Sequence, residues 1–268
     1  MKLILNADDF GMCESVTNGI IKAYQEGVVR STTMMVTMPF AKEAVKLMEE
    51  NTGLGVGLHL NLTVGKPICS DLKTIVDEDG NFLSKQAYKD HADDIDVKEI
   101  EKEYQAQIAQ FIKLTGHLPT HIDHHHSYRL VPKQVFAIKA LADYYHLPIR
   151  GGAQLFKDNY DFERVIISND PKTTFYGDTV HIDFFLKEND YLFINEMMEM
   201  MCHPGFNSEE LEKISAYNTQ REVELSILTD TRLMEWLNDR HIELINYQDI
   251  KKNKLIESIG LKEFGYKS

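Results

Sequence analysis

The 268-residue sequence predicts an α/β protein in which helices cover a parallel sheet. Short apolar runs of strand type alternate with longer segments of helical periodicity, and this alternation continues along most of the chain. The length also fits one α/β barrel, because such barrels often span about 200–250 residues or more. We therefore expect a single domain over residues 1–268.

The first half of the chain contains two βα units and the helix of a third. A predicted strand at 3–6 is followed by a helix at 15–26, which Gly27 ends. A run rich in β-branched and methionine residues predicts a strand at 31–37. Apolar residues at helical spacing predict a helix at 40–50, and an apolar run predicts a strand at 55–62. Alternating charges on an amphipathic pattern predict a helix at 97–114.

The second half continues the same alternation. A strand is predicted at 120–124, and the helix at 133–145 is introduced by Pro132 near its first turn. Further strands are expected at 147–150, 198–202 and 242–247, with one or two helices within 219–238. Weak periodicity near 64–96 and 154–187 predicts loop insertions, which either contain sugar-binding residues such as Tyr176 and His181 or are only surface insertions.

Composition and charge narrow the range of partners. The formal net charge of −13 argues against binding nucleic acid or an anionic membrane, because such proteins neutralise phosphates with clustered Lys and Arg. No apolar run approaches the roughly 20 residues that span a bilayer, and acidic residues follow the N-terminus closely, so we expect a cytoplasmic protein. Three scattered cysteines form no disulfide or zinc motif.

Two neighbouring carboxylates, Asp8 and Asp9, leave the end of the first predicted strand. The C-terminal strand ends of a barrel face its active site, and adjacent acids there repel each other unless a cation or shared proton offsets the cost. An Asp-based turn or a helix N-cap would also explain the pair.

Histidines follow at three later strand ends. His59 lies inside an apolar strand, where it is either a ligand or a core histidine with one hydrogen-bond partner. Residues 120–126 read THIDHHH, and alternation along a strand places His121, Asp123 and His125 on one face and the other histidines opposite. His203 precedes Pro-Gly and could be a ligand, a general acid or a structural residue.

Together these strand ends would bring a carboxylate and several imidazoles to one rim. One carboxylate and two imidazoles leave positions open on a divalent ion for water and substrate. Metal-assisted hydrolysis follows from this donor set, with a neighbouring carboxylate to take a proton and a histidine to protonate the leaving group.

The sequence resembles the YdjC-type carbohydrate deacetylases, which include chitooligosaccharide deacetylases. The resemblance rests on NADDFG (6–11), GLHLNLT (57–63), THIDHHH (120–126) and CHPG (202–205), and it covers most of the chain. It implies a distorted (β/α) barrel of the polysaccharide-deacetylase-like type that forms homodimers. It also implies the Mg²⁺- or Zn²⁺-dependent release of acetate from N-acetylglucosamine-containing oligosaccharides, a step of chitin degradation.

The family pattern, carried over onto this chain, makes Asp9, His59 and His125 the metal ligands and Asp8 the general base. It makes His203 the acid. Residues expected to bind substrate or support the ligands are His121, Asp123 and Arg150.

One departure concerns the histidine run. Related sequences often read Asp-Ser-His-His-His, whereas this chain has Asp123 followed directly by three histidines. We select His125 because it keeps the i to i+4 relation to His121, which leaves His124 or His126 as the alternative ligand. The competing functions are another metal-dependent sugar hydrolase or isomerase on the same barrel, and a non-catalytic sugar-binding protein.

Overall fold

The computed structural model describes residues 1–126, 132–150, 165–167, 174–188 and 197–250, and the statements below refer to these residues. The strands are β1 (Lys2–Phe10), β2 (Ser31–Met34), β3 (Gly55–Leu60), β4 (Ile122–His124), β5 (Val165–Ile167), β6 (Met197–Cys202) and β7 (Glu243–Leu244). The α-helices are α1 (Glu14–Gln25), α2 (Ala41–Glu50), α3 (Lys85–Asp90), α4 (Val97–Thr115), α5 (Pro132–Tyr145), α7 (Glu209–Ile214), α8 (Thr219–Leu228) and α9 (Thr231–Asp239). A 3₁₀ turn, η2 (Gly177–Thr179), and a π-helical turn, η3 (Phe184–Glu188), complete the set.

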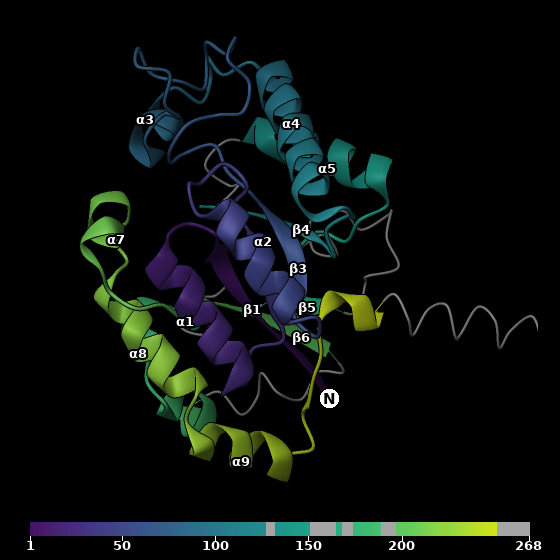
Figure 1. The fold of residues 1–268 in the computed structure, drawn as a ribbon, viewed down its shortest axis with the longest axis vertical. Helices are drawn as coiled ribbons and strands as arrows, with labels where there is room; N and C mark the ends of the chain where they lie inside the picture. Colours follow the sequence, from purple (N-terminus) through teal and green to yellow (C-terminus); the bar gives the residue numbers. More distant parts are fainter. Residues whose placement is uncertain (127–131, 151–164, 168–173, 189–196, 251–268) are drawn as a thin grey trace, which may run out of the picture.

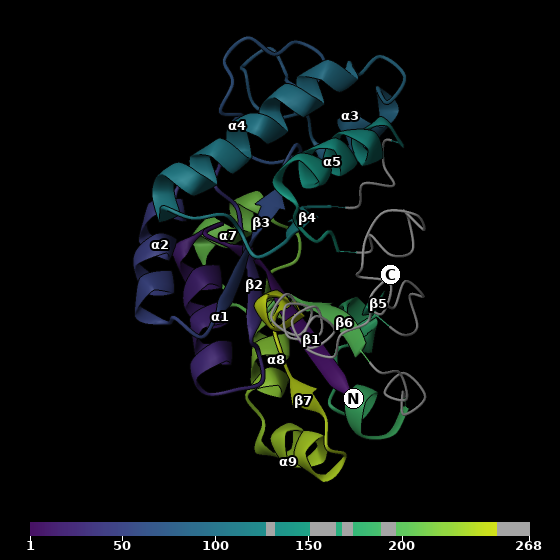
Figure 2. The ribbon, with the colours of Figure 1, turned by 90° about the vertical axis from the view of Figure 1, so that its right-hand side faces the viewer.

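The strands form one parallel sheet in the order β4-β3-β2-β1-β6-β5, and β7 pairs with the first residues of β1. The sheet curls into part of a barrel, with helices packed around it (Figure 1, Figure 2). This arrangement confirms the predicted α/β class and the distorted barrel. Because the strands are parallel, their C-terminal ends meet at one edge.

Helix α4 shows how the sequence specifies an element of the outer layer. Asp96 caps its first turn by accepting a hydrogen bond from the backbone N–H of Lys98, and Gly116 ends it in the left-handed conformation, at φ 78°. The buried face carries apolar residues at helical spacing, including Ile100 and Ile108. This face packs toward the sheet, and α5 lies alongside α4 (Figure 2).

The central strands are buried along almost their whole length. Every residue of β3 is buried, and so is every residue of β1 except Lys2. A strand covered on both faces normally reads as a continuous apolar run. The polar residues that interrupt these runs therefore need partners inside the protein.

Several element bounds differ from those predicted. Strand β1 continues to Phe10 rather than ending at Asn6, because backbone pairing with β2 continues to Phe10 past an irregularity in register. The predicted strand at 147–150 is reduced to one parallel bridge, between Ile149 and Ile122. The predicted helical stretch at 219–238 is two helices, α8 and α9.

The two predicted loop insertions contain short elements. Residues 64–96 include α3 and an antiparallel bridge between Val76 and Phe82. The insertion near 154–187 lies partly outside the described residues, and its described part contains β5 and the two short turns η2 and η3. The single domain over residues 1–268 stays a prediction.

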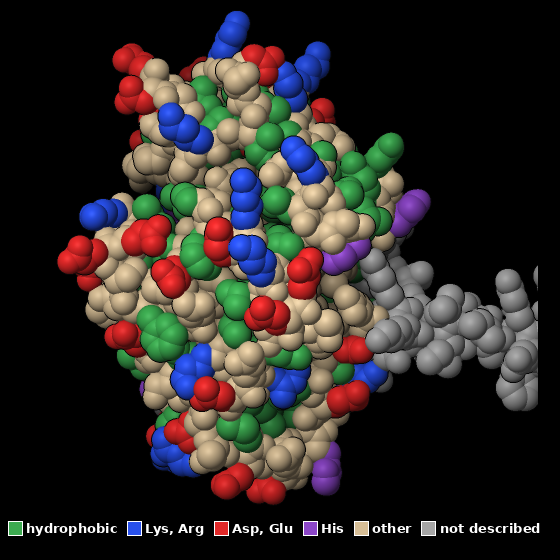
Figure 3. Space-filling model, viewed as in Figure 1, with side chains coloured by type: hydrophobic (Ala, Val, Ile, Leu, Met, Phe, Trp, Pro, Cys, Tyr) green, Lys and Arg blue, Asp and Glu red, His purple; other side chains and the backbone are tan. Residues whose placement is uncertain are grey.

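The molecular surface carries charges of both signs. On the face shown in Figure 3, Lys and Arg side chains alternate with Asp and Glu rather than forming a basic patch. None of the described helices combines the length and apolar character that a membrane crossing requires.

Candidate metal centre and active site

An irregularity in β1 brings Asp8 and Asp9 to the same site. Neighbouring residues of a regular strand point to opposite faces, so two adjacent carboxylates would normally separate. The pairing of β1 with β2 shifts register between Ala7 and Phe10, and Asp9 has a positive φ of 76°. Such a bulge redirects a side chain and is common beside active sites. Both carboxylates are buried, at 3% and 1% exposure.

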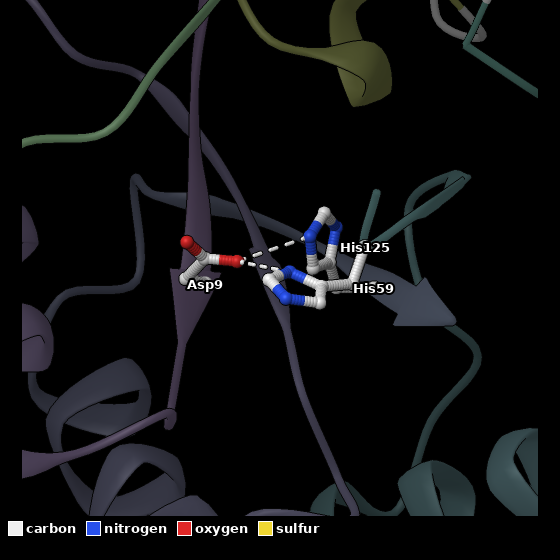
Figure 4. Close-up of side chains that lie close together, drawn as sticks. All are labelled: Asp9, His59 and His125. Carbon is white, nitrogen blue, oxygen red and sulfur yellow. Dashed lines mark hydrogen bonds and ion pairs between the residues drawn. The ribbon is translucent and has the colours of Figure 1, made fainter. Parts of the chain in front are cut away.

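Three predicted ligands meet around one oxygen atom of Asp9. The Nδ1 atom of His125 lies 2.9 Å from Asp9 Oδ1, and the Nε2 atom of His59 lies 3.2 Å from the same oxygen (Figure 4). Potential ligand atoms of these three residues lie within 4.8 Å of one another. His59 comes from β3, His125 follows β4 and Asp9 belongs to β1, so the ends of three strands of the sheet supply the cluster.

The cluster fits a divalent cation by its chemistry. It offers one carboxylate oxygen and two imidazole nitrogens, a donor set that suits Zn²⁺ and leaves coordination positions open. A histidine that binds a metal usually also has a hydrogen-bond partner that orients its ring. His59 has one, because its Nδ1 lies 2.7 Å from Asp123 Oδ1, which leaves Nε2 directed at Asp9.

Asp123 is itself fixed by hydrogen bonding. Thr33, in β2, donates from its hydroxyl to Asp123 Oδ2 over 2.9 Å. Arg150 contacts the same oxygen at 2.8 Å. Asp123 is 1% exposed, so these contacts take the place of water. The orientation of His59 therefore depends on a buried polar network built from β2, β4 and the segment after α5.

The remaining histidines of the 120–126 run have other surroundings. His124 Nδ1 lies 2.5 Å from the carbonyl oxygen of His126, and His126 Nδ1 lies 2.8 Å from the Thr63 hydroxyl. His121 stacks on Tyr247, with ring centroids 3.8 Å apart. Of these four histidines, the structure brings His125 into the group with Asp9 and His59.

Arg150 binds Asp8 through two hydrogen bonds. Its Nη1 donates to Asp8 Oδ2 over 2.7 Å and its Nη2 to Asp8 Oδ1 over 2.5 Å, while its Nε donates to Glu199 Oε1 over 2.6 Å. Asp8, His59 and Asp123 form a second group with metal-ligand spacing. Because Arg150 already contacts both carboxylates of this second group, the Asp9 group fits a cation better.

His203 also approaches Asp8. Its Nε2 atom is 3.9 Å from Asp8 Oδ2, and its backbone N–H donates to Glu224 of α8. Tyr217 donates from its hydroxyl to the same Glu224 carboxylate over 2.5 Å. Tyr176 stacks on Tyr217, at 4.3 Å between ring centroids, and is 43% exposed. An accessible aromatic ring thus stands beside the predicted acid.

Arg221, also in α8, contacts the predicted metal ligand Asp9. Its Nη2 donates to Asp9 Oδ2 over 2.6 Å, and its Nε donates to the carbonyl oxygen of Tyr217 over 2.8 Å. The residue is 2% exposed. The two oxygens of Asp9 therefore differ, since Oδ2 contacts Arg221 and Oδ1 contacts the two histidines.

These contacts shift the ionisation of the site. Burial raises the pKa of Asp8, but Arg150 outweighs it and holds that pKa below the usual range. Burial likewise raises the pKa of Asp9, and Arg221 with His125 brings it well below its ordinary value. Burial lowers the pKa of His203 to about 4. Both carboxylates are thus ionised at neutral pH, and His203 can accept a proton before donating one.

Some residues of the site were not found from the sequence. Glu199 interrupts the methionine-rich strand β6, and a carboxylate inside an apolar run is the same kind of signal that drew attention to His59. Arg221 and Glu224 gave no such signal, because charged residues on a helix usually face solvent. The expected binding residue His181 lies between η2 and η3, where its backbone N–H donates to the carbonyl oxygen of Thr179.

Comparison with known proteins identifies the family. The model of the YdjC-like protein family matches residues 2–239. A carbohydrate deacetylase of Clostridium beijerinckii is 34% identical over 251 residues, covering 93% of this chain and 100% of that protein. A carbohydrate deacetylase of Listeria welshimeri is 36% identical over 253 residues, with the same coverage of both chains.

A solved structure agrees with this assignment. The crystal structure of an Enterococcus faecalis protein, described as a candidate for cellobiose-phosphate cleavage, superposes with a TM-score of 0.82. It is 32% identical and covers 93% of this chain and 98% of its own. The family match over residues 2–239 includes the strands that supply the site, and together these comparisons confirm the resemblance drawn from the sequence motifs. The chain belongs to the YdjC-like family.

Proposed function

We propose that this protein is a metal-dependent carbohydrate deacetylase that releases acetate from N-acetylglucosamine-containing oligosaccharides such as chitooligosaccharides. One divalent ion, Mg²⁺ or Zn²⁺, would be held by Asp9, His59 and His125. The deacetylases of Clostridium and Listeria support this activity. The observation that carries the proposal is the meeting of both histidines on Asp9 Oδ1, with Asp8 and His203 alongside.

The bound cation would polarise the acetyl carbonyl and acidify a water molecule. Asp8 is the general base, because Arg150 keeps it ionised and fixes both of its oxygens. His203 is neutral at neutral pH, so it would take up the proton that Asp8 removes from the water and pass it to the leaving amine. Its Nε2 atom lies 3.9 Å from Asp8 Oδ2. Asp123 holds His59 in its ligating orientation.

Tyr176 is the proposed sugar-contacting residue. Its ring is partly exposed, its inner face is supported by Tyr217, and its centroid lies 5.3 Å from that of His203. A supported aromatic ring offers an apolar surface for the C–H face of a sugar. Replacing it in Tyr176→Ala should raise KM about tenfold with little change in kcat, because the ring contributes to binding and not to proton transfer.

The direct test is a product assay on N-acetylated chito-oligomers of two to six units. Acetate and free amine should appear in equal amounts with the oligomer length unchanged, and a chelator should abolish the reaction until Mg²⁺ or Zn²⁺ is restored. Shortened oligomers without acetate would instead indicate glycosidic cleavage, the kind of reaction suggested by the description of the Enterococcus protein. Oligomer binding that survives metal removal, without product, would indicate a sugar-binding protein.

Two finer expectations remain predictions. Elemental analysis of protein purified without added metal would identify the resident ion, since Asp with two His suits Zn²⁺ by ligand type while the family also admits Mg²⁺. A homodimer is expected from the family resemblance, and light scattering coupled to gel filtration would measure the mass in solution against 30.9 kDa for one chain.

A further inference from the structure

We infer that Arg221 is a positioning residue that makes Asp9 a one-oxygen ligand. The inference rests on the metal centre of the proposed function and adds a residue to it. Arg221 lies 212 positions from Asp9 in the sequence and approaches it from α8, a helix that supplies none of the predicted ligands. It acts on the cation only through the Asp9 carboxylate.

The contacts of Asp9 separate its two oxygens. Oδ2 accepts a hydrogen bond of 2.6 Å from Arg221 Nη2, whereas Oδ1 lies within 3.2 Å of both His59 Nε2 and His125 Nδ1. A charge-assisted hydrogen bond of this length is strong in a buried site. An ion that binds where the two imidazoles converge therefore meets Oδ1, while Oδ2 is already held.

The backbone at Asp9 sets where the carboxylate leaves the strand, but it does not fix the torsions of the side chain. Asp9 has a positive φ of 76°, a conformation that few residues other than Gly, Asn and Asp adopt. Its side chain could rotate and offer both oxygens to an ion. Arg221 prevents this rotation, so one more coordination position stays available to water and substrate.

The position of Arg221 is itself rigid. Its Nε donates to the Tyr217 carbonyl oxygen over 2.8 Å, its guanidinium lies 5.8 Å from the Tyr217 ring centroid, and its Cδ lies 3.2 Å from the place where a Cβ of Gly205 would stand. A larger residue than glycine at 205 would therefore press on this side chain. The Nε atom of Arg221 is therefore fixed by Tyr217, and its Nη2 atom points to Asp9.

One nitrogen of the Arg221 guanidinium makes no hydrogen bond among the described residues, which argues against a purely structural role. Its Nη1 is buried and has no hydrogen-bond partner among the described residues. Leaving a buried donor unpaired is costly, so such a group calls for an explanation. By contrast, Nη1 of Arg30 donates to the carbonyl oxygens of Tyr24, Gly27 and Val29 and serves the end of α1.

The test compares Zn²⁺-loaded wild type with Arg221→Met, using crystal structures and X-ray absorption of frozen solutions. In the wild type, Asp9 Oδ1 should lie about 2.0–2.2 Å from Zn²⁺ while Oδ2 stays on Arg221. In Arg221→Met, both oxygens should reach ligand distance. Because a coordination position is lost, kcat on an acetylated chito-oligomer should fall about 10–100-fold with KM nearly unchanged.

Arg30→Met is the control, because it removes a partly buried arginine whose contacts serve the end of α1 and not the cluster. It should lower Tm while leaving Asp9 bound through one oxygen and kcat near the wild-type value. Wild type with both Asp9 oxygens on Zn²⁺ would overturn the inference even if Arg221→Met failed to fold. So would Arg221→Met with one oxygen bound and unchanged kcat. Wild type that binds no Zn²⁺ would instead overturn the metal centre itself.

Discussion

The two sides of the site are built in different ways. On one side, the ends of β1, β3 and β4 bring Asp8, Asp9, His59 and His125 together on rigid backbone. On the other side, α8 reaches the same groups with long side chains, through Arg221 to Asp9 and through Glu224 to the backbone of His203. In the proposed function, the strand side would carry the reacting groups and the helix side would orient them.

This difference implies different consequences of mutation. A strand-end residue supplies an atom to the reaction, so its loss should remove a step or the cation. A supporting residue acts through a second group, so its loss should reduce turnover or stability by a smaller factor. The following measurements test this ordering.

The largest effect is expected for His125→Ala. Removing one of three protein ligands should reduce bound Zn²⁺ well below one per chain and lower turnover by at least about 10³-fold. Metal content by elemental analysis and acetate release measure both quantities. His121→Ala is the matched control, because this histidine of the same run is fully buried against Tyr247, away from the ligand group. If the two variants lost metal equally, His125 would have no special place in the site.

Asp8→Asn is expected to separate chemistry from metal binding. The amide keeps the size of the side chain but cannot act as a base, so kcat should fall by about 10²–10⁴-fold. Zn²⁺ content should stay near that of the wild type, because Asp9, not Asp8, is the carboxylate at the histidines. A wild-type rate in this variant would remove Asp8 from the mechanism.

Much of the strand side could be predicted from the sequence. Asp8 and Asp9 stand at a strand end, and His59 is a polar residue in an apolar run, so position and pattern together indicated the site. The bulge that turns Asp9 toward Asp8 could not be predicted, since it depends on a register shift between two paired strands. The choice of His125 over its neighbours came from the family pattern, and the geometry places it beside Asp9.

The helix side could not be predicted in the same way. Arg221 and Glu224 lie three positions apart on one face of α8, but a charged residue on an amphipathic helix usually indicates a solvent-facing side. Both side chains are buried because α8 packs against α1, and this tertiary contact cannot be seen in the pattern of the helix alone. Arg150 was expected from the family resemblance to bind substrate or support the ligands, but its contacts with the carboxylates of Asp8 and Asp123 could not be predicted.

A smaller effect is expected for Thr33→Val, which removes the hydroxyl donor to Asp123 while keeping the shape of the side chain. With Asp123 less constrained, His59 should orient less well, and affinity for Zn²⁺ should fall about tenfold. Thr32→Val is the matched control, because the Thr32 hydroxyl donates to the carbonyl oxygen of Ala7 instead. Competition with a chelator measures both affinities, and equal losses would show that the hydroxyl of Thr33 has no particular role.

On the helix side, the expected effect of Glu224→Gln is on the pH dependence of stability rather than on metal binding or turnover. Burial raises the pKa of Glu224 from 4.5 to about 7, and the negative charge of Asp8 adds to this rise. The hydrogen bonds from Tyr217 and His203 and the charge of Arg221 act in the opposite direction but do not cancel it. The folded protein thus holds this proton more tightly than the unfolded chain does. The resulting stabilisation is complete below about pH 4.5 and is lost as pH rises through about 7.

Gln cannot titrate, so wild type should lose stability relative to Glu224→Gln between pH 4.5 and 7, by on the order of 1–3 kcal/mol, with no further change above about pH 8. Calorimetric Tm values of the two proteins across this pH range measure the difference in stability. Other titratable groups are present in both proteins, so their contributions largely cancel. Glu222→Gln, on the exposed side of the same helix, should follow the wild-type curve. Parallel curves for wild type and Glu224→Gln would mean that the buried carboxyl releases its proton as easily as an exposed one, and that α8 orients His203 without a cost in stability.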